Sequence, residues 1–337
     1  MNNFPPLPGV PLPATVDRID WQRQRRDGIG SSDASAILGL SNYASAYSLW
    51  EEKTGRAPLD APVSPEMERL RRFGHVMEPV ISRLTADELG IGIHKPEDAV
   101  HHRDYPWLRC NLDGWTSDGR IAEFKNVHQS QAALWDGQIP DHAEVQVTHS
   151  GIVLEVDEAV VAGLIGGNRL AVHEMVISAT VKEILFEAEA KFWEHVEADT
   201  PPAVDDHEET VRAVMREWEH RPGAKQVDEF DVQEWHELYF DAHSRELEAA
   251  KDKRRARANI AALMDGHESL ATGTVVWATA RRGQLDRTRL EHEQPDVFAR
   301  FVRPKEMFDL EEFKRAEPAL YDKYRSTSVM PKRYATE

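Results

Sequence analysis

Two acidic residues and a lysine near the middle of the chain have the types and spacing of a site that handles phosphate. Asp113 lies in Asn-Leu-Asp-Gly-Trp, and Glu123 and Lys125 follow in Ile-Ala-Glu-Phe-Lys. Between them, Ser-Asp-Gly at 117–119 favours a turn between two strands. Strands that meet symmetrically about this turn set Asp113 opposite Glu123, and alternation along the second strand puts Lys125 on the same face as Glu123. Hard divalent cations prefer such oxygen clusters, and a lysine beside metal and water suits phosphodiester chemistry.

The spacing alone leaves two interpretations open. One is a metal-assisted site, and the other is a surface hairpin that carries an ordinary pair of Glu and Lys side chains. Several short motifs around the pair favour the first interpretation, because they occur in a distinctive order. In chain order they are Gly-Ile-Gly-Ser-Ser-Asp at 28–33, Trp-Glu-Glu-Lys-Thr-Gly at 50–55, Phe-Gly-His-Val-Met-Glu-Pro at 73–79, Asn-Leu-Asp-Gly at 111–114, Glu-Phe-Lys at 123–125, and Ile139-Pro140 leading to Gln146.

This ordered set resembles the YqaJ-type viral recombinase family, whose members are similar to lambda exonuclease and belong to the PD-(D/E)-x-K nuclease superfamily. The resemblance covers roughly residues 20–200, and its specificity comes from the order of the motifs, since each motif alone is weak. It implies an α/β fold with a restriction-endonuclease-like mixed sheet flanked by helices. In this chain a C-terminal extension with a long helix and a small β element follows.

The resemblance also assigns roles to individual side chains. The implied catalytic residues are Asp113, Glu123, Lys125 and Gln146. Asp113 and Glu123 would hold a metal ion together with the backbone carbonyl of Phe124, and Glu78 would contribute from its helix. Lys125 would orient or help to deprotonate the attacking water, or stabilise the phosphate charge, and Gln146 would hold the water or the scissile phosphate. Because all these ligands are oxygens, we expect Mg²⁺, with Mn²⁺ as a substitute.

A second group of residues is expected to bind DNA or its terminal 5′-phosphate. The candidates are Arg25, Arg26, Ser31, Ser32, Arg71 and His75. Arg25 or Arg26, together with Ser31 or Ser32, matches the place where lambda-type relatives bind the terminal 5′-phosphate. The two parallel N–H donors of a guanidinium suit a phosphate group. The alternative is that the serines cap a helix and the arginines are solvated. Arg71 and His75 share a helix face with Glu78, which is either a polar outer face or part of the site.

The region around Gln146 departs from the family pattern. Ala143 and Glu144 stand where aromatic residues are expected, and Thr148 replaces a second glutamine. These departures concern the handling of substrate more than the metal site, whose carboxylates and lysine are intact.

The composition limits the classes of protein that the chain can belong to. It has 337 residues with 41 basic and 59 acidic side chains, a net charge of −18. Taken alone this charge argues against binding of nucleic acid, but it does not report the field inside one groove. The single cysteine, Cys110, excludes a disulfide within the chain and a cysteine-based zinc site. With no apolar run of transmembrane length and no evident secretory signal, we expect no membrane partner. The resemblance implies a phage- or prophage-encoded protein in the bacterial cytoplasm.

The chain is expected to divide into three parts. Residues 1–20 are rich in proline and predict a loose N-terminal arm. Residues 21–200 form the PD-(D/E)-x-K nuclease domain, and Pro201-Pro202 marks its end. Residues 201–337 predict a helical, coiled-coil-like extension with a short β-hairpin. Within the nuclease domain the expected elements are a helix over 66–88 that Pro79 kinks or restarts, the catalytic strands within 99–126, a helix over 144–156, strands over 158–165 and 172–177, and an amphipathic helix over 180–197.

The extension begins with a long helix over 227–264. Its apolar stripe is coiled-coil-like but not strict, and comprises Val232, Trp235, Leu238, Tyr239, Ala242, Leu247 and Ala250. A strand over 271–280 and a polar tail follow, and no internal repeats are evident. We expect this arm to mediate self-association or contact with a single-strand annealing protein, with weak DNA contact through the basic run 251–257.

These observations and the resemblance favour an Mg²⁺-dependent DNA exonuclease of the phage recombination type, and the 5′-to-3′ direction is what the resemblance implies. It would resect double-stranded DNA ends and expose single strand. Two alternatives remain, an endonuclease or repair nuclease of the same superfamily and a non-cleaving DNA-binding or assembly protein on the same fold. The expected partners are double-stranded DNA ends, further copies of the chain (a ring trimer, by resemblance), and a single-strand annealing protein.

Overall fold

The computed structural model describes residues 4–15, 17–59, 64–216, 223–281, 284–302, 308–324 and 331, without the side chains of residues 322 and 323. The chain forms two compact units, Met1–Trp218 and Glu219–Glu337. The division lies after Trp218, whereas the sequence predicts it near residue 200. The reason is α7 (Glu208–Arg216), which packs on the first unit. The hydroxyl of Thr210 donates to Ser45 over 2.6 Å with both residues buried, and Arg216 pairs with Glu51.

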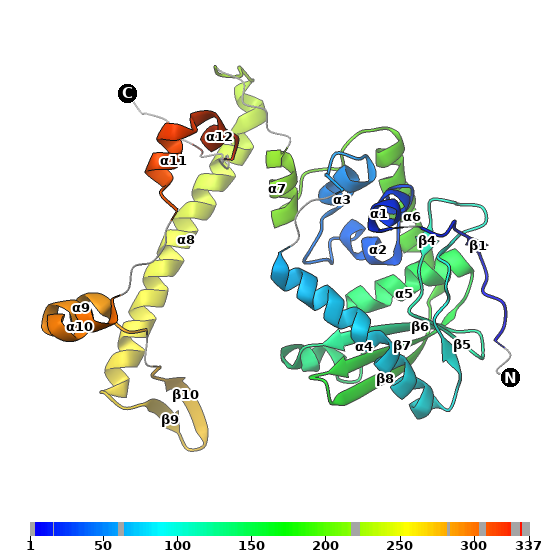
Figure 1. Ribbon diagram of the computed structural model, residues 1–337, viewed down its shortest axis with the longest axis horizontal. Coiled ribbons are helices and arrows are strands. Elements are labelled where there is room, and N and C mark those ends of the chain that lie inside the picture. Colours follow the sequence, from blue (N-terminus) through cyan, green and yellow to red (C-terminus); the bar gives the residue numbers. More distant parts are fainter. Residues whose placement is uncertain are drawn as a thin grey trace. The chain divides into compact units, whose positions relative to one another are not determined.

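The first unit is built on a mixed five-stranded sheet in the order β2-β5-β6-β7-β8. Strands β5 to β8 are labelled in Figure 1. The strands are β2 (Ile93–His94), β5 (Gly114–Thr116), β6 (Ile121–Val127), β7 (Glu158–Ile165) and β8 (Arg169–Val176). Only β6 and β7 pair in parallel, and the other neighbours are antiparallel. All of β7 except Glu158 is buried, as is typical of a strand covered on both faces. The predicted α/β fold, a mixed sheet flanked by helices, is confirmed.

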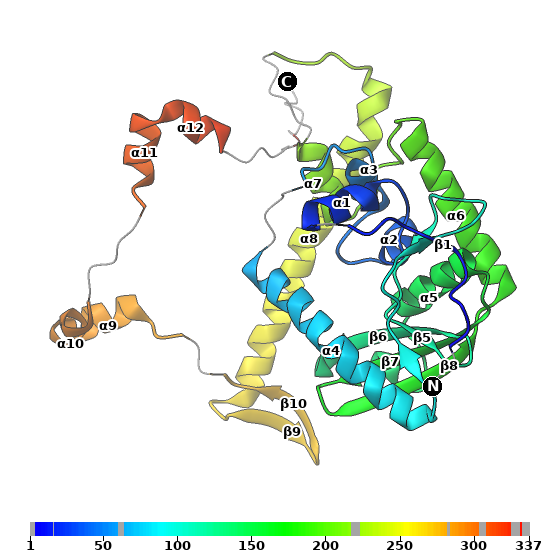
Figure 2. The same ribbon diagram turned by 45° about the vertical axis from the view of Figure 1, so that its right-hand side comes forward.

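Two helices cover opposite faces of this sheet, and alternation along β6 decides which side chains meet which helix. The long helix α4 (Pro65–Leu89) places Ile81 against Phe124. Helix α5 (Asp141–Leu154) places Val147 in the other core layer with Ile121. Figure 2 shows both helices on the sheet from a second direction. Residues 121, 123 and 125 of β6 therefore share the face that meets α5.

Helix α4 passes through Pro79 without interruption. The sequence predicts a kink or a restart there, because proline removes a backbone donor. The packing of Met77 and Ile81 against the sheet on both sides of Pro79 accounts for the continuity. Ser64 caps the helix at its start by accepting from the backbone N–H of Met67, and Gly90 ends it in a left-handed conformation.

Three short helices and α6 form a second core beside the sheet. They are α1 (Arg18–Arg26), α2 (Ser31–Ile37), α3 (Ala46–Lys53) and α6 (Ala179–Glu197). Ile29, Trp50 and Phe192 are buried together in this core. The helices matter for function because they carry the predicted phosphate-binding residues.

The N-terminal segment lies along the first unit, in contrast to the loose arm that its prolines predict. Strand β1 (Val10–Pro11) pairs with β3 (Val100–His101), which pairs in turn with β4 (Arg109–Cys110). The carbonyl of Pro5 accepts the indole N–H of Trp115 over 2.9 Å. Proline lacks a backbone donor but keeps its carbonyl acceptor, so a proline-rich segment can still be fixed at the edge of a sheet.

The second unit contains the long helix and the short hairpin that the sequence predicts. The single strand expected over 271–280 is wrong, because Gly273 adopts positive φ and a turn there separates two strands. Helix α8 (Glu229–Met264) ends at Asp265 and Gly266, both with positive φ, and β9 (Ser269–Thr272) and β10 (Val275–Thr279) pair antiparallel. Four short helices follow, α9 (Arg287–Glu293), α10 (Pro295–Phe301), α11 (Leu310–Ala316) and α12 (Pro318–Lys323). No helix in the described ranges is long and apolar enough to cross a membrane.

The four short helices form two copies of one motif, so the prediction that the chain has no repeats is wrong. Asp286 caps α9 and Asp309 caps α11, each by accepting a backbone N–H three residues later over 2.9 Å. Pro295 begins α10 and Pro318 begins α12. The offset is 23 residues in both cases, from 286 to 309 and from 295 to 318. The copies share caps, prolines and apolar positions rather than most residue identities, which hides the repeat in the sequence.

Candidate active site

The hairpin of β5 and β6 sets the register of the central acidic residues. Gly114 pairs with Ala122 and Trp115 pairs with Ile121. One further step in this register places Asp113 opposite Glu123, as symmetry about Asp118 predicts. The Asp113 carboxylate accepts the backbone N–H of Phe124 over 3.0 Å, which fixes it across the end of the hairpin.

Lys125 joins the hairpin to α5. Its Nζ donates to Oε1 of Glu123 over 2.6 Å and to Oε1 of Gln146. Glu123 is 8 % exposed, so the pair lies at the border of the core. The contact with Gln146 is possible because residues 123 and 125 share the face of β6 that meets α5. The structure therefore brings together all four residues that the resemblance implies are catalytic.

The charges of this cluster do not balance. Burial, together with the nearby charge of Glu123, raises the pKa of Asp113 to about 7, although the N–H of Phe124 and the ammonium of Lys125 act in the opposite direction. Burial alone would lower the pKa of Lys125, but Glu123, Asp113 and Glu78 raise it overall. The acidic groups thus exceed what one lysine compensates, and a cation at Asp113 would relieve the excess.

Glu78 approaches the cluster from α4. It accepts from Nδ1 of His75 over 2.9 Å and from Nζ of Lys95 over 2.7 Å. Glu78, His75, Lys95 and Asp113 line one cavity of about 750 Å³. Arg71 is exposed on the same helix and is absent from this lining within the described part of the chain.

A bound metal ion would have to rely on few protein ligands. Among the residues that the structure describes, no three His, Cys, Asp or Glu side chains gather closely enough to hold a metal by themselves. Asp113 and Glu123 nevertheless fit Mg²⁺, because this ion is commonly held by one or two carboxylates and completes its shell with water and substrate phosphate. The uncompensated charge of Asp113 supports that fit. Glu78 is paired with His75 and Lys95. Its role as a third metal ligand stays a prediction, and Asp113 and Glu123 are the main candidates.

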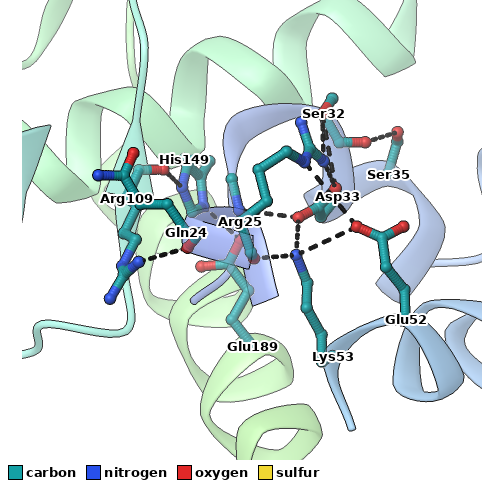
Figure 3. Close-up of polar contacts among 11 residues, drawn as sticks. Gln24, Arg25, Ser32, Asp33, Ser35, Glu52, Lys53, Arg109, His149 and Glu189 are labelled. Atoms are coloured by element: carbon teal, nitrogen blue, oxygen red, sulfur yellow. Dashed lines mark hydrogen bonds and ion pairs between the residues drawn. The ribbon is translucent and has the colours of Figure 1, made fainter. Parts of the chain in front are cut away.

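A second polar cluster joins α1, α2 and α3 (Figure 3). Asp33 accepts from Arg25 over 2.5 Å, from Nζ of the buried Lys53 over 2.6 Å, and from the backbone N–H of Gly30 over 3.0 Å. Burial alone would raise the pKa of Asp33, but Arg25, Lys53 and the Gly30 N–H outweigh it and hold this pKa well below its usual range. In this cluster the carboxylate is fully compensated.

The residues predicted to bind the 5′-phosphate divide into two groups. Arg25 and Ser32 lie together, with Nη2 of Arg25 3.4 Å from the serine hydroxyl, and the Arg25 side chain is 30 % exposed. Arg26 instead donates to the carbonyl of Ala57. Ser31 shares a hydrogen bond of 2.9 Å with Ser150 of α5.

Helix α5 connects this cluster to the hairpin. Ser150 lies one helical turn after Gln146 and donates to its backbone carbonyl over 3.2 Å. Ser150 contacts α2 through Ser31, and Gln146 contacts Lys125 of β6. One turn of helix therefore touches both groups of predicted functional residues.

Sequence reasoning missed two buried polar pairs. Lys53 follows the buried Trp50 by three residues on α3, and a lysine on an apolar helix face requires a carboxylate, here Asp33. Sequence reasoning also missed His149 of α5, whose ring nitrogens face Glu189 of α6 over 2.6 Å and the carbonyl of Arg109 over 2.8 Å. Burial alone would lower the pKa of His149, but Glu189 and the carbonyl raise it.

Comparisons with known proteins found a matching family, a relative and similar solved structures. Residues 20–157 match the family described as the YqaJ-like viral recombinase domain. The chain is 29 % identical over 218 residues to the uncharacterized protein YqaJ of Bacillus subtilis (strain 168), which covers 63 % of this chain and 67 % of that protein. Similar solved structures include an alkaline exonuclease from Laribacter hongkongensis, with a TM-score of 0.44, 13 % identity, and coverage of 53 % of this chain and 93 % of that one. The same exonuclease in complex with dAMP gives a TM-score of 0.44 and 14 % identity, with the same coverage.

Proposed function

Because residues 20–157 match the family described as the YqaJ-like viral recombinase domain, we propose that the chain is a metal-dependent DNA exonuclease of the phage recombination type. It resects double-stranded DNA ends by phosphodiester hydrolysis and exposes single strand. The observation that carries the proposal is the set of contacts at the end of the hairpin. Asp113 and Glu123 face each other in register, and Lys125 contacts both Glu123 and Gln146.

The side chains divide the chemistry between them. Mg²⁺, or Mn²⁺ in its place, would be held by Asp113 and Glu123 with the carbonyl of Phe124, and would neutralise phosphate charge and activate water. Lys125 presents its ammonium to the phosphate oxygens or to the attacking water. Gln146 fixes that ammonium and orients the water through its amide group. This division explains why one lysine is held by a carboxylate and an amide at once.

The direction of resection follows from the Arg25 cluster. Asp33, Ser32 and Glu52 take part of the hydrogen-bonding and charge-pairing capacity of Arg25, and its partly exposed side chain offers the rest to a terminal 5′-phosphate. Because α5 touches both this cluster and Lys125, a strand held by its 5′-phosphate lies near the hairpin. We therefore assign 5′-to-3′ degradation to the enzyme.

The proposed partners are double-stranded DNA ends, further copies of the chain, and a single-strand annealing protein that takes up the exposed strand. The nuclease residues all lie in the first unit. A chain that ends after residue 218 should therefore keep metal-dependent cleavage. A chain that ends at residue 200 loses α7, whose Thr210 is buried against Ser45, and should be less stable.

The test is digestion of linear, nicked and closed circular duplex DNA with Mg²⁺ and with a chelator. We expect degradation of the linear duplex from its ends, in Mg²⁺ only, and intact closed circles. Glu123→Gln should abolish cleavage, whereas Glu97→Gln, the same change at an exposed position of this unit, should not. Cleavage of closed circles would identify an endonuclease instead. A wild-type chain that binds DNA ends and leaves every substrate intact would contradict the proposal.

A further inference from the structure

Helix α8 is long and has no buried residue. Its 36 residues span about 54 Å at about 1.5 Å per residue. Large apolar side chains on it are open to solvent, with Trp235 64 % exposed and Leu263 70 % exposed. Helices in proteins owe most of their stability to the packing of an apolar face. An apolar face of this length requires a partner.

A series of exposed apolar side chains follows a heptad pattern, while Phe230, Leu238 and Leu247 are exposed outside this series. Apolar residues recur at alternating spacings of three and four, which places them along one side of the helix. The series is Val232, Trp235, Tyr239, Ala242, Ala249, Ala256, Ile260 and Leu263. Two charged residues, Glu246 and Lys253, occupy the remaining positions of the same series. They decide how a second helix can pack on this face.

The charges along α8 separate into two halves. Residues 229–248 hold seven acidic side chains and one basic one, Arg245, whereas residues 249–264 hold five basic side chains and one acidic one, Asp252. Two such helices in parallel would align acid with acid and base with base. In the antiparallel arrangement the acidic half of each helix lies along the basic half of the other, which lowers the electrostatic energy.

We propose that α8 binds a second copy of the same helix from another chain, in antiparallel orientation. The register that aligns the ends of the series places Val232 of one copy opposite Leu263 of the other, and Trp235 opposite Ile260. Glu246 of each copy then lies about one helical turn from Lys253 of the other. A parallel pair would place each Glu246 against its own counterpart and each Lys253 likewise. This pairing is independent of the nuclease activity.

Charge reversal at the two central positions tests the pairing. In the full chain, Glu246→Lys and Lys253→Glu should each weaken self-association by about tenfold or more, because two attractions become repulsions. An equimolar mixture of the two variants should associate again. Matched controls are Glu237→Lys and Lys251→Glu, which make the same changes on the opposite side of α8. The readout is the mass in solution over a range of concentrations, by sedimentation or light scattering.

Cysteine cross-linking tests the orientation. The natural Cys110 is buried, and burial raises the pKa of its thiol, so it stays out of the reaction. Under oxidation the full-length variants Val232→Cys and Leu263→Cys should each remain unlinked alone, and their mixture should give a disulfide-linked pair of chains. Cross-linking of either variant with itself would establish a parallel pair. The proposal would be overturned if the mixture gave no cross-link. It would also be overturned if the charge reversals at 246 and 253 left the mass in solution unchanged, and the apolar face would then bind a different partner.

Discussion

The pKa values of two aspartates in the first unit, the buried Asp33 and the half-buried Asp113, are shifted in opposite directions. The pKa of Asp113 is raised to about 7, and the pKa of Asp33 is held well below its usual range. Burial acts in the same direction on both carboxyl groups, so it does not explain the difference. The neighbours do: Asp33 lies between the guanidinium of Arg25 and the ammonium of Lys53, whereas Asp113 faces a second carboxylate, Glu123.

This difference separates a structural carboxylate from a functional one. The charge of Asp33 is compensated by α1 and α3, so it ties three helices together. The charge of Asp113 is left without a full counterpart, which is costly unless a cation binds. The two lysines differ in the same way. The buried Lys53 donates to Asp33 and to a backbone carbonyl, whereas the half-buried Lys125 is held between a carboxylate and an amide.

The largest expected effect is on cleavage. Asp113→Asn keeps the shape of the side chain and its contact with the Phe124 N–H but removes the charge that would hold a cation. We expect cleavage of linear duplex to fall by at least about 10²-fold, comparable to the loss of a preorganised electrostatic contact. Lys125→Ala should do the same. Asp98→Asn, on an exposed loop, is the control and should cleave like the wild type. Near-wild-type rates in Asp113→Asn would remove the basis of the assignment.

The second effect is on stability, and here the change at Asp33 is expected to matter more than the change at Asp113. Asp33→Asn leaves the buried Lys53 ammonium without its carboxylate, and should lower the free energy of unfolding by about 3–5 kcal/mol. Asp113→Asn should leave the free energy of unfolding unchanged or raise it in metal-free buffer, because it removes an uncompensated, half-buried charge. Denaturant unfolding of both variants and of Asp98→Asn measures this contrast. If Asp33→Asn and Asp113→Asn lower the free energy of unfolding equally, the distinction between the two clusters fails.

The pH dependence of the Asp33 effect can be derived from the direction of its pKa shift. The pKa is lower in the folded chain than in the unfolded one, so the stabilisation is fully present above the unfolded value of about 4 and is lost as the pH falls through the folded value. The difference in free energy of unfolding between wild type and Asp33→Asn should stay constant from pH 8 to about pH 5 and shrink below about pH 4. A difference that already closes between pH 7 and pH 5 would assign the stability to another group.

The smallest expected effect is on the recognition of DNA ends. A 5′-phosphorylated duplex should be degraded several-fold faster than a 5′-hydroxyl duplex, in line with the gain from one charge-assisted contact. Arg25→Ala should erase this preference. Arg26→Ala should retain it, because Arg26 is directed at the carbonyl of Ala57. Time courses on the matched substrates decide the matter, and equal loss of preference in both variants would mean that the arginines contact the DNA backbone in general.

The sequence predicted best where local rules decide the structure. The Ser-Asp-Gly turn and strand alternation were sufficient to place Asp113 opposite Glu123 and to put Lys125 beside Glu123. The long helix α8 and the hairpin after it follow from periodicity in the same way. The sequence also located the mixed sheet, because its strands and helices alternate along the chain.

Contacts between distant segments were beyond these rules. The pairing of Asp33 with Lys53, the fixing of the N-terminal segment by Trp115, and the packing of α7 on α3 all depend on tertiary structure. A proline-rich segment and the Pro201-Pro202 pair look like ends of structure in a sequence. The first is nevertheless paired at the edge of a sheet, and after the second the chain packs on as α7. The repeated helix pair in the second unit was missed because capping and spacing, rather than residue identity, define it.

Binding of Mn²⁺ tests the contrast between the two aspartates most directly. Electron paramagnetic resonance of free Mn²⁺, titrated with the full chain in the absence of DNA, reports how much ion the protein holds. The account predicts saturable binding by the wild type, retained by Asp33→Asn at a temperature where that variant is folded, and lost in Asp113→Asn. Binding that persists in Asp113→Asn, or a wild type that holds no Mn²⁺ at millimolar concentrations, would contradict it.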